Sequence, residues 1–274
     1  ERSRELEAFL ASARGRFPHL VEELQGMADG LGVPFRELFA YNCRSEIAAL
    51  HEDDGCSTIA LRSEGRMILA HNEDGDDRNV GRMFLAKVRA SSGVTFLAFV
   101  YPGLLPGNGP GLNDRGVAQT TNYIQPWETR PGVPRYFVGR AVLESKTLDE
   151  AVALATEGGR AFPWHHNLVS LTEGRYLSVE ALPEKHDVLE PQGVYVHTNH
   201  IVHPELLEGS EEPPDVPGES SRTRMRVLRD AIAERGAPGD ADGLRQLLSL
   251  HDGRPYSPCR HPQGAVEADH LAGQ

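Results

Sequence analysis

The chain has 274 residues, of which 39% are apolar and 25% are charged, so it can bury a substantial core. This composition excludes a disordered, collagen-like or coiled-coil protein. Asp and Glu number 40 against 28 Lys and Arg, which gives a formal net charge of −12. A surface of that sign repels phosphate backbones and anionic lipids, so we expect neither nucleic acid nor a membrane as a partner.

The three cysteines are Cys43, Cys56 and Cys259. They are too few to form a disulfide framework, which indicates a reducing compartment or thiol chemistry, and we expect a cytoplasmic protein. The longest apolar runs, such as residues 96–100, are too short to span a bilayer. The sequence begins at Glu1 rather than at a methionine, which leaves open a leader removed before that residue.

The first fifty residues are expected to be helical. Apolar residues at helical spacing predict amphipathic helices at about 6–17 and 20–28, and Pro18 limits the first of them. Gly30 or Gly32 is expected to end the second helix. Pro34 is typical of a first helical turn and predicts a third helix running towards Asn42.

After residue 51 the pattern changes to short strand-like segments separated by Gly, Asp and Ser turns. It predicts an antiparallel meander with strands at 57–61, 67–70, 84–88 and 94–101. Residues 102–116 hold five glycines, three prolines and two asparagines, which predicts a loop. A strand is expected to follow at 117–123.

The second half of the chain alternates between the two kinds of element. Thr147 and Glu150 form a capping box that opens a helix through residue 155. The later predicted segments are strands at 168–171, 176–181 and 194–198, a solvated connection at 205–220, and helices at about 221–235 and 240–251. Without an internal repeat or a dividing linker, this order favours an α+β domain with sheet stacked on sheet.

Residues 55–58, Gly-Cys-Ser-Thr, carry the candidate chemistry. One interpretation of Cys56 is a buried thiol that packs as a small hydrophobe. The other is an N-terminal nucleophile, in which the thiol attacks the Gly55 carbonyl and the chain breaks. Cys56 would then hold a free α-amine that can act as the base for its own thiol. Gly55 suits this role, because the absence of a side chain lets the scissile peptide approach the sulfur.

Further motifs follow in order along the chain. They are His71-Asn72-Glu73-Asp74, the run 111–117 (GLNDRGV) with Asn122, His197-Thr198-Asn199-His200, and Ser220-Ser221-Arg222. Together with a helical leader ending in NCRSE at 42–46 and a tail at 250–261, they give a resemblance that covers most of the chain. The sequence resembles the acyl-coenzyme A:isopenicillin N acyltransferase family of autoproteolytic Ntn hydrolases. It resembles the choloylglycine hydrolases more distantly.

The resemblance implies a four-layer αββα sandwich, with two antiparallel sheets face to face between helical layers. It implies self-cleavage between Gly55 and Cys56, so that residues 1–55 become a small α-chain and residues 56–274 the associated catalytic β-chain of the same domain. The implied activity is that of an amidohydrolase or acyltransferase working through an acyl-cysteine intermediate. Its substrate would be a small-molecule amide or thioester, with acyl-coenzyme A one candidate. Neither a cofactor nor a metal is expected.

The resemblance also implies roles for single residues. Cys56 matches the nucleophile, and Asp74 matches the acid that orients the new α-amine. Thr58 matches a hydroxyl that assists precursor cleavage. Asn122 and Asn199 match amides near the oxyanion and the substrate, and side-chain amides are suitable oxyanion donors because they do not titrate.

Four more residues complete the expected site. Ser221 and Arg222 match a pair near the nucleophile, while His71 and Asn72 are candidates for supporting or substrate-binding roles. The choloylglycine hydrolases carry an arginine where His71 stands, so their substrate contacts are not transferred. Each assignment has a structural alternative: Asp74 could be a turn carboxylate, for example, and Ser221 a helix N-cap.

Two other functions stay open. His197, His200 and His203 recur every three residues, which would place three zinc ligands on one side of a helix. The strand-like residues 194–196 argue against that zinc hydrolase, because a strand turns neighbouring side chains to opposite faces. The second alternative is a non-catalytic Ntn-like shell that binds a small molecule and stays uncleaved. Cys43 and Cys259 are interpreted as buried thiols.

Overall fold

A computed structural model describes residues 2–47, 55–63, 66–75, 79–124, 129–208 and 218–261. Its first helices are α1 (Arg2–Arg16), α2 (Pro18–Leu31), α3 (Phe35–Tyr41) and the short α4 (Arg44–Ile47). The three predicted helices are therefore confirmed. Gly32 ends α2 with a φ of 69°, a left-handed conformation that glycine adopts without steric cost.

The strands of the described residues form two antiparallel sheets. The smaller sheet has the order β10-β1-β2 and is built from β1 (Gly55–Ser63), β2 (Arg66–Asp74) and β10 (Gly193–His197). The larger sheet follows the chain order from β3 to β9. Its strands are β3 (Phe84–Arg89), β4 (Thr95–Val100), β5 (Gly111–Asn113), β6 (Val117–Tyr123), β7 (Trp164–Ser170), β8 (Arg175–Ala181) and β9 (His186–Leu189).

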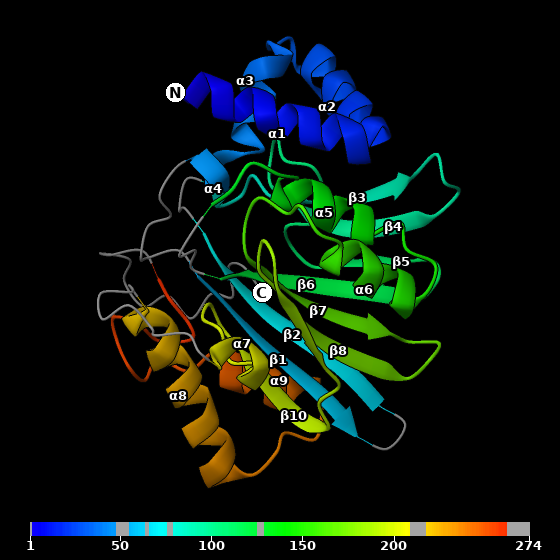
Figure 1. Cartoon of the computed structure of the whole chain (residues 1–274). Coiled ribbons are helices and arrows are strands. Elements are labelled where there is room, and N and C mark those ends of the chain that lie inside the picture. The colour runs from blue at the N-terminus through cyan, green and yellow to red at the C-terminus, as the bar shows by residue number, and fades with distance from the viewer. Residues whose placement is uncertain are drawn as a thin grey trace.

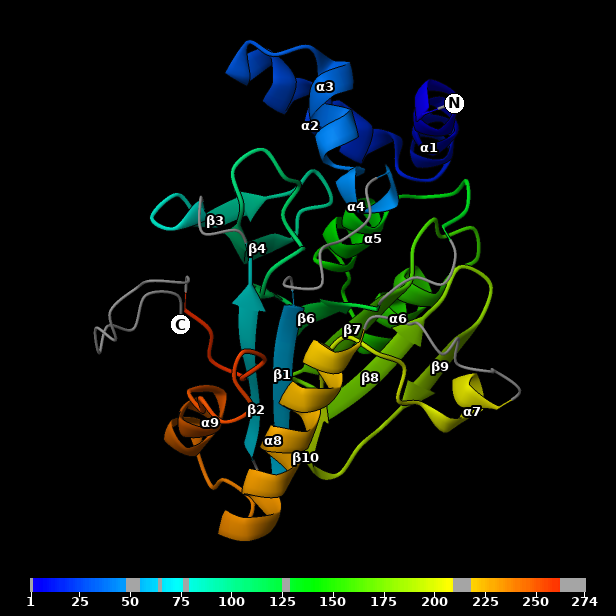
Figure 2. The ribbon, with the colours of Figure 1, turned by 90° about the vertical axis from the view of Figure 1, so that its left-hand side faces the viewer.

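Helices cover the outer face of each sheet. α5 (Arg135–Val142) and α6 (Leu148–Thr156) pack on the larger sheet, and α8 (Glu219–Arg235) and α9 (Ala241–Leu248) pack on the smaller one. Figure 2 shows α8 and α9 beside β1, β2 and β10, with α6 beside β7 and β8. The short helix α7 (Pro204–Leu207) follows β10. None of the described helices combines the length and the apolar character needed to cross a bilayer.

Separate apolar clusters join these layers. Ile59 and Leu61 of β1 pack against Leu228 of α8, whereas Ala60, the residue between them, packs against Tyr176 of the larger sheet. This alternation is the period of a strand that is buried on both faces. The predicted four-layer αββα arrangement is thus confirmed.

Three expectations for the elements are wrong in part. The predicted four-stranded meander is divided, because β1 and β2 lie in the smaller sheet while β3 and β4 begin the larger one. The predicted loop at 102–116 contains the strand β5, and the predicted connection at 205–220 contains most of α7 and the start of α8. Residues 209–217 of that connection lie outside the described residues. Periodicity predicts a strand but not its partner, which explains the first error.

The sequence analysis did not predict the helix α5. Every residue of α5 is buried, and these include the two arginines Arg135 and Arg140, which a sequence pattern would place on a solvent-facing side. Its Arg140 donates from Nε and Nη2 to the carboxylate of Glu23 on α2, at 3.0 and 2.7 Å. The same guanidinium contacts Glu144 at 2.9 Å. Paired carboxylates therefore offset the cost of burying this cation.

The opening helices pack on α5 through a cluster of aromatic side chains. The ring of Phe39 on α3 lies 5.8 Å from those of Phe35 and of Phe137 on α5, centroid to centroid. Phe39 is 1% exposed, and Leu20 and Leu24 of α2 belong to the same cluster. Figure 1 shows α1, α2 and α3 at one end of the molecule, next to α5.

Replacing Phe39 by alanine should lower the free energy of unfolding by about 3–5 kcal/mol, since it removes a buried ring and leaves a cavity. Urea unfolding followed by circular dichroism measures this. The matched control is Leu31→Ala on α2, whose side chain is 60% exposed and should cost less than about 0.5 kcal/mol. Equal losses in the two variants would mean that the α3–α5 contact is not part of the core.

Candidate active site

The hairpin of β1 and β2 brings the first candidate residues together. Its register pairs Gly55 with Asp74, Cys56 with Glu73, and Thr58 with His71. The start of β1 and the end of β2 therefore lie at one end of the sandwich, below α4 in Figure 2. Cys56 is buried there, with 5% of its surface exposed.

The backbone on both sides of Cys56 is held by two side chains. Its N–H donates to Asn199 Oδ1 at 2.9 Å, and its carbonyl oxygen accepts from Nη1 of Arg224. Nη2 of Arg224 also donates to Asn199 Oδ1, at 2.7 Å, so the amide and the guanidinium fix each other. Charge-assisted bonds of this kind are among the strongest in a protein interior.

This arrangement leaves no room for a side chain at residue 55. A Cβ added to Gly55 would lie 2.6 Å from Nη2 of Arg224 and 3.3 Å from Oδ1 of Asn199. The first distance is far below a van der Waals contact. Glycine is thus required before the cysteine as long as Arg224 keeps its place.

The thiol of Cys56 faces a carboxylate. Its Sγ lies 3.6 Å from Oε2 of Glu73, which lies 3.0 Å from Nε2 of His71. Nδ1 of His71 lies 2.8 Å from the hydroxyl of Thr58. Burial raises the pKa of the Cys56 thiol well above its usual range, and the charges of Glu73 and Asp74 raise it further. In the intact chain the thiol is protonated and needs a base to become a nucleophile.

Asp74 is a buried carboxylate beside two cations. Its Oδ2 lies 3.6 Å from Nε of Arg260. Burial raises its pKa to about 6, against the opposing charges of Arg224 and Arg260. The carboxyl group opposite Gly55 therefore changes its charge close to neutral pH.

The structure brings Asn199 and Ser221 together. Besides its contacts to Cys56 and Arg224, Asn199 donates from Nδ2 to the carbonyl of Tyr123 at 2.9 Å. Its backbone N–H donates to Ser221 Oγ at 2.7 Å. Ser221 lies inside α8, whose N-cap is Gly218, so the N-cap interpretation of this serine is wrong.

Asn122 is connected to the site through Thr58. Its Oδ1 accepts from the Thr58 hydroxyl at 3.0 Å and from Asn167 Nδ2 at 2.9 Å. Asn122 is fully buried, and its Nδ2 has no hydrogen-bond partner among the described residues. An unpaired buried donor is rare, and it is available to a group that enters the site.

Two expected site residues point elsewhere. Arg222 is exposed on α8, and the guanidinium at the nucleophile is that of Arg224. The reason is helical geometry, because Ser221 and Arg224 are three residues apart and share a face. Asn72 donates from Nδ2 to the carbonyls of Leu248 and Pro258, at 2.8 and 3.0 Å, and so ties the C-terminal segment to β2.

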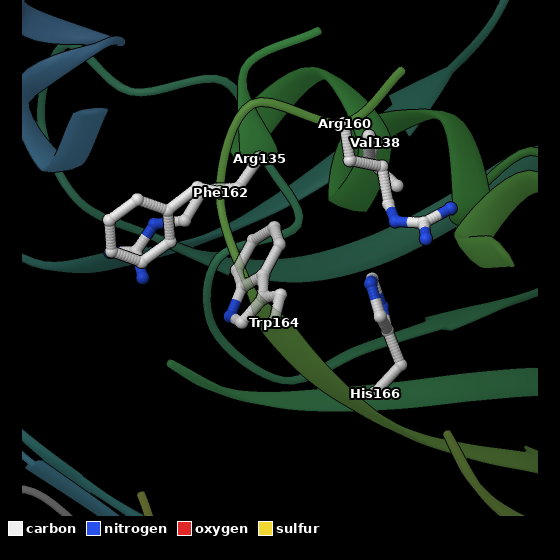
Figure 3. Close-up of a pocket in the computed structure, with 6 residues that line it drawn as sticks. All are labelled: Arg135, Val138, Arg160, Phe162, Trp164 and His166. Atoms are coloured by element: carbon white, nitrogen blue, oxygen red, sulfur yellow. The ribbon is translucent and has the colours of Figure 1, made fainter. Parts of the chain in front are cut away.

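A second polar region lies on the other face of β7, against α5. Figure 3 shows a pocket whose lining residues are Arg135, Val138, Arg160, Phe162, Trp164 and His166. The guanidinium carbon of Arg135 lies 5.1 Å from the ring centroids of Phe162 and Trp164, a cation–π arrangement. Burial, and then the charge of Arg160, lowers the pKa of His166 to about 3. His166 is therefore neutral. The charge of Arg135, like the larger effect of Arg224, opposes the burial that raises the pKa of the Cys56 thiol.

The three histidines of the zinc alternative do not converge. Nε2 of His197 lies 2.8 Å from Oε1 of Glu180, and Nδ1 of His200 lies 2.7 Å from Ser221 Oγ. Nε2 of His203 lies 2.8 Å from Ser178 Oγ. Three different partners leave no shared point for an ion, as expected for an extended backbone.

Comparison with known proteins gives the family. Residues 61–269 match the family model described as acyl-coenzyme A:6-aminopenicillanic acid acyl-transferase. The chain belongs to this family. The resemblance seen in the sequence is therefore confirmed, and the matched region begins just after Cys56.

Two known proteins are similar to this chain in sequence. The β-alanyl-dopamine/carcinine hydrolase of Drosophila melanogaster is 27% identical over 169 residues, which cover 55% of this chain and 44% of the relative. The acyl-coenzyme A:6-aminopenicillanic-acid-acyltransferase 40 kDa form of Emericella nidulans is 25% identical over 261 residues, or 94% of this chain and 70% of the relative. The chain thus spans less than half the length of the fly protein.

Two solved structures are similar at lower identity. A variant of the conjugated bile acid hydrolase from Clostridium perfringens matches with a TM-score of 0.45 and 13% identity, covering 71% of this chain and 78% of that one. Penicillin V acylase from Agrobacterium tumefaciens matches with a TM-score of 0.44 and 13% identity, covering 80% and 76%.

In this member of the acyl-transferase family, sequence reasoning missed Glu73, Arg224 and Arg135 as site residues. Glu73 could have been found from the pairing of the two neighbouring strands β1 and β2, because their register sets it directly opposite Cys56. Arg224 could have been found from helical spacing to Ser221. Arg135 was missed because the helix that carries it was not predicted, and nothing in the sequence places that helix beside β7. Cys43 is buried as expected, whereas Cys259 is partly exposed.

The raised pKa of Asp74 predicts how stability depends on pH. The folded protein holds the Asp74 proton more tightly than the unfolded chain, whose pKa is near the ordinary 3.8. The contribution of this carboxyl group to stability is therefore fully present below about pH 4 and is lost as the pH rises through about 6. The side chain of the Asp74→Asn variant cannot ionise. As the pH rises from about 4 to about 6, the difference in free energy of unfolding between this variant and the parent should therefore change by up to about 3 kcal/mol in favour of the variant.

This measurement is best made with Cys56→Ala as the parent, so that both proteins are one continuous chain. Urea unfolding at about pH 4, 5, 6 and 7 brackets the titration. Asp114→Asn, a change at a carboxylate that is 43% exposed, is the matched control and should keep a constant difference from the parent. If the free energy of unfolding of Asp74→Asn also differs from that of the parent by a constant amount at every pH, the pKa of Asp74 is not raised by burial.

Proposed function

We propose that this protein is a self-cleaving N-terminal-cysteine amidohydrolase or acyltransferase that acts on small molecules. The observation that carries the proposal is the setting of the Gly55–Cys56 peptide bond. Its nitrogen donates to Asn199, the next carbonyl accepts from Arg224, and residue 55 has no space for a side chain. A buried thiol that served only for packing would not require this arrangement.

The first reaction is the cleavage of the chain. Sγ of Cys56 attacks the carbonyl carbon of Gly55 while its proton passes to the nearby carboxylate of Glu73. The bond from that carbon to the nitrogen of Cys56 breaks as the nitrogen takes up a proton, leaving a thioester on Sγ. Water then hydrolyses the thioester, which gives a carboxylate on Gly55 and returns the thiol of Cys56 with a free α-amine.

The second reaction is the turnover of substrate. The new α-amine has an ordinary pKa of about 8 and can take the proton of its own thiol, while Oδ1 of Asn199 holds it in place. The thiolate attacks the carbonyl carbon of the substrate, the leaving amine or thiol takes a proton, and an acyl-cysteine remains. Water or an amine then accepts the acyl group.

Side-chain amides supply neutral donors for the oxyanion of both reactions. In the intact chain Nδ2 of Asn199 donates to the carbonyl of Tyr123, whereas Nδ2 of Asn122 has no partner among the described residues. We therefore assign Asn199 first to positioning the nitrogen of Cys56. Asn122 has the spare donor.

The substrate class follows from the family and from the relatives' names. One relative is named as a hydrolase of β-alanyl-dopamine and carcinine, the other as an acyltransferase to 6-aminopenicillanic acid. We propose a small-molecule amide as the substrate of this chain, with an acyl-coenzyme A thioester as a further acyl donor. Hydrolysis and transfer share every step up to the acyl-cysteine and differ in the acceptor.

The purified protein should consist of two fragments, produced by a break in the chain between Gly55 and Cys56. The fragments should stay associated. Mass spectrometry under denaturing conditions measures the fragments, and gel filtration shows that they stay together through the apolar contacts of the opening helices. Cys56→Ala should give a single full-length chain, and Cys259→Ala should cleave like the parent. A parent protein that stays intact and turns over no amide would be the non-catalytic shell.

Arg224 and Arg222 form a matched pair for testing the site. Arg224→Leu should lower kcat/KM on the order of 100-fold or more, because it removes the cation that fixes Cys56 and Asn199. Arg222→Leu lies on the exposed side of the same helix and should stay within about two-fold. Fragment analysis before the assay separates a defect in cleavage from one in turnover. Equal effects of the two variants would remove Arg224 from the site.

A further inference from the structure

A second cluster of ligand-type side chains lies in the segment that follows α9. Nε2 of His251 is 2.8 Å from Nε2 of His261, and Sγ of Cys259 is 3.6 Å from the same His261 nitrogen. All three atoms lie within 4.8 Å of one another. His251 and His261 are exposed and Cys259 is partly exposed, so the cluster is open to solvent.

The distance between Cys259 and His261 fits a tetrahedral zinc ion, and the distance between the two histidines is close to one that would. Zinc–sulfur bonds of about 2.3 Å and zinc–nitrogen bonds of about 2.0 Å place tetrahedral ligand atoms about 3.6 Å apart for S and N, and about 3.3 Å apart for two N. Sγ of Cys259 and Nε2 of His261 are already 3.6 Å apart, the separation expected for a sulfur and a nitrogen bound to zinc. The Nε2 atoms of His251 and His261 need to move apart by about half an ångström to reach the separation of about 3.3 Å expected for two zinc-bound nitrogens.

The donor set is selective. One thiol and two imidazoles are the ligands of zinc and of similar transition metals, whereas magnesium and calcium prefer oxygen. The group contains no carboxylate, so it is not one of the acidic surface clusters that are common without an ion. The rings of His251 and His261 are nearly parallel, 15° apart with centroids at 5.0 Å, and both turn Nε2 to the same point.

We propose that His251, Cys259 and His261 form a zinc site that fixes the C-terminal segment, with the fourth position open to water. Binding releases the thiol proton of Cys259 to solvent and leaves the thiolate on the metal. The site is separate from the reaction of Cys56 and takes no part in its chemistry.

The position of the cluster explains what the ion would do. Arg260 stands between two of the ligands, and it reaches back to Asp74 and to the hydroxyl of Ser220. The adjoining Pro258 carbonyl accepts from Asn72 of β2 at 3.0 Å. A metal held by the flanking side chains restricts this loop and so keeps the guanidinium of Arg260 beside the Asp74 carboxylate.

Within the described residues one other group has ligand atoms close enough for a metal, namely Cys56, His71 and Glu73. These belong to the candidate active site, where the thiol is buried and His71 and Glu73 contact each other. An ion at that group would block the nucleophile. The experiment must therefore tell the two groups apart.

The test uses the full chain, purified without chelator and analysed for metal by plasma mass spectrometry. We expect about one zinc per chain in the parent protein and in Cys56→Ala, and a loss of at least ten-fold in His251→Ala and Cys259→Ser. His186→Ala, at an exposed histidine outside the cluster, is the matched control and should retain the metal. Cobalt loaded in place of zinc should show a thiolate charge-transfer band that Cys259→Ser lacks.

Thermal unfolding gives a second readout, in which each protein is compared with itself before and after the metal is removed. A chelator should lower the Tm of the parent protein by roughly 5 °C and leave that of His251→Ala unchanged. The proposal is overturned if zinc is lost from Cys56→Ala but kept by the cluster variants, or if the parent takes up no zinc or cobalt. An equal chelator effect on the Tm of parent and His251→Ala would also overturn it.

Discussion

The guanidinium of Arg224 is the interaction on which the candidate site depends. It is almost fully buried, it contacts the carbonyl of Cys56 and the amide of Asn199, and it lies against the only side of Gly55 where a side chain could point. Burial lowers the pKa of this arginine, and the charge of Asp74 opposes that effect. The charge of Asp74 offsets part of the desolvation of Arg224, and the charges of Arg224 and Arg260 offset part of the desolvation of Asp74. The carboxyl group at the end of β2 and the guanidinium on α8 thus each favour the charged form of the other.

The interior between the sheets is polar in its central part. From Thr58 a connected set of side chains runs through Asn122 and His165 to Ser178 and His203. Burial, followed by the charges of neighbouring histidines, lowers the pKa of His165 well below its usual range, so the ring is neutral in this network. A buried network of this kind fixes a single arrangement of the layers, since a shift would leave further groups unpaired beside Nδ2 of Asn122.

The same polar interior explains where strand prediction succeeded and where it did not. β1, β7 and β8 are buried on both faces, but one face of β7 carries His165 and Asn167 in place of apolar residues. Strand-forming residues and turn signals still marked most strands, because those signals are local. The pairing of β3 with β4 in a different sheet from β1 and β2 was not predictable, since antiparallel strands of equal character can pair in several orders.

The sequence by itself determined the family, the identity of the candidate nucleophile and its glycine, and most of the elements, because these are written in local order and spacing. It did not show which of the arginines on α8 would reach Cys56, or that Glu73 rather than Asn72 would face the thiol. It also gave no sign that His251, Cys259 and His261 would meet in space. These were decided by strand register, by the rotation of a helix and by the path of the last loop. Each of them depends on contacts between segments far apart in the chain, and local propensity carries no information about such contacts.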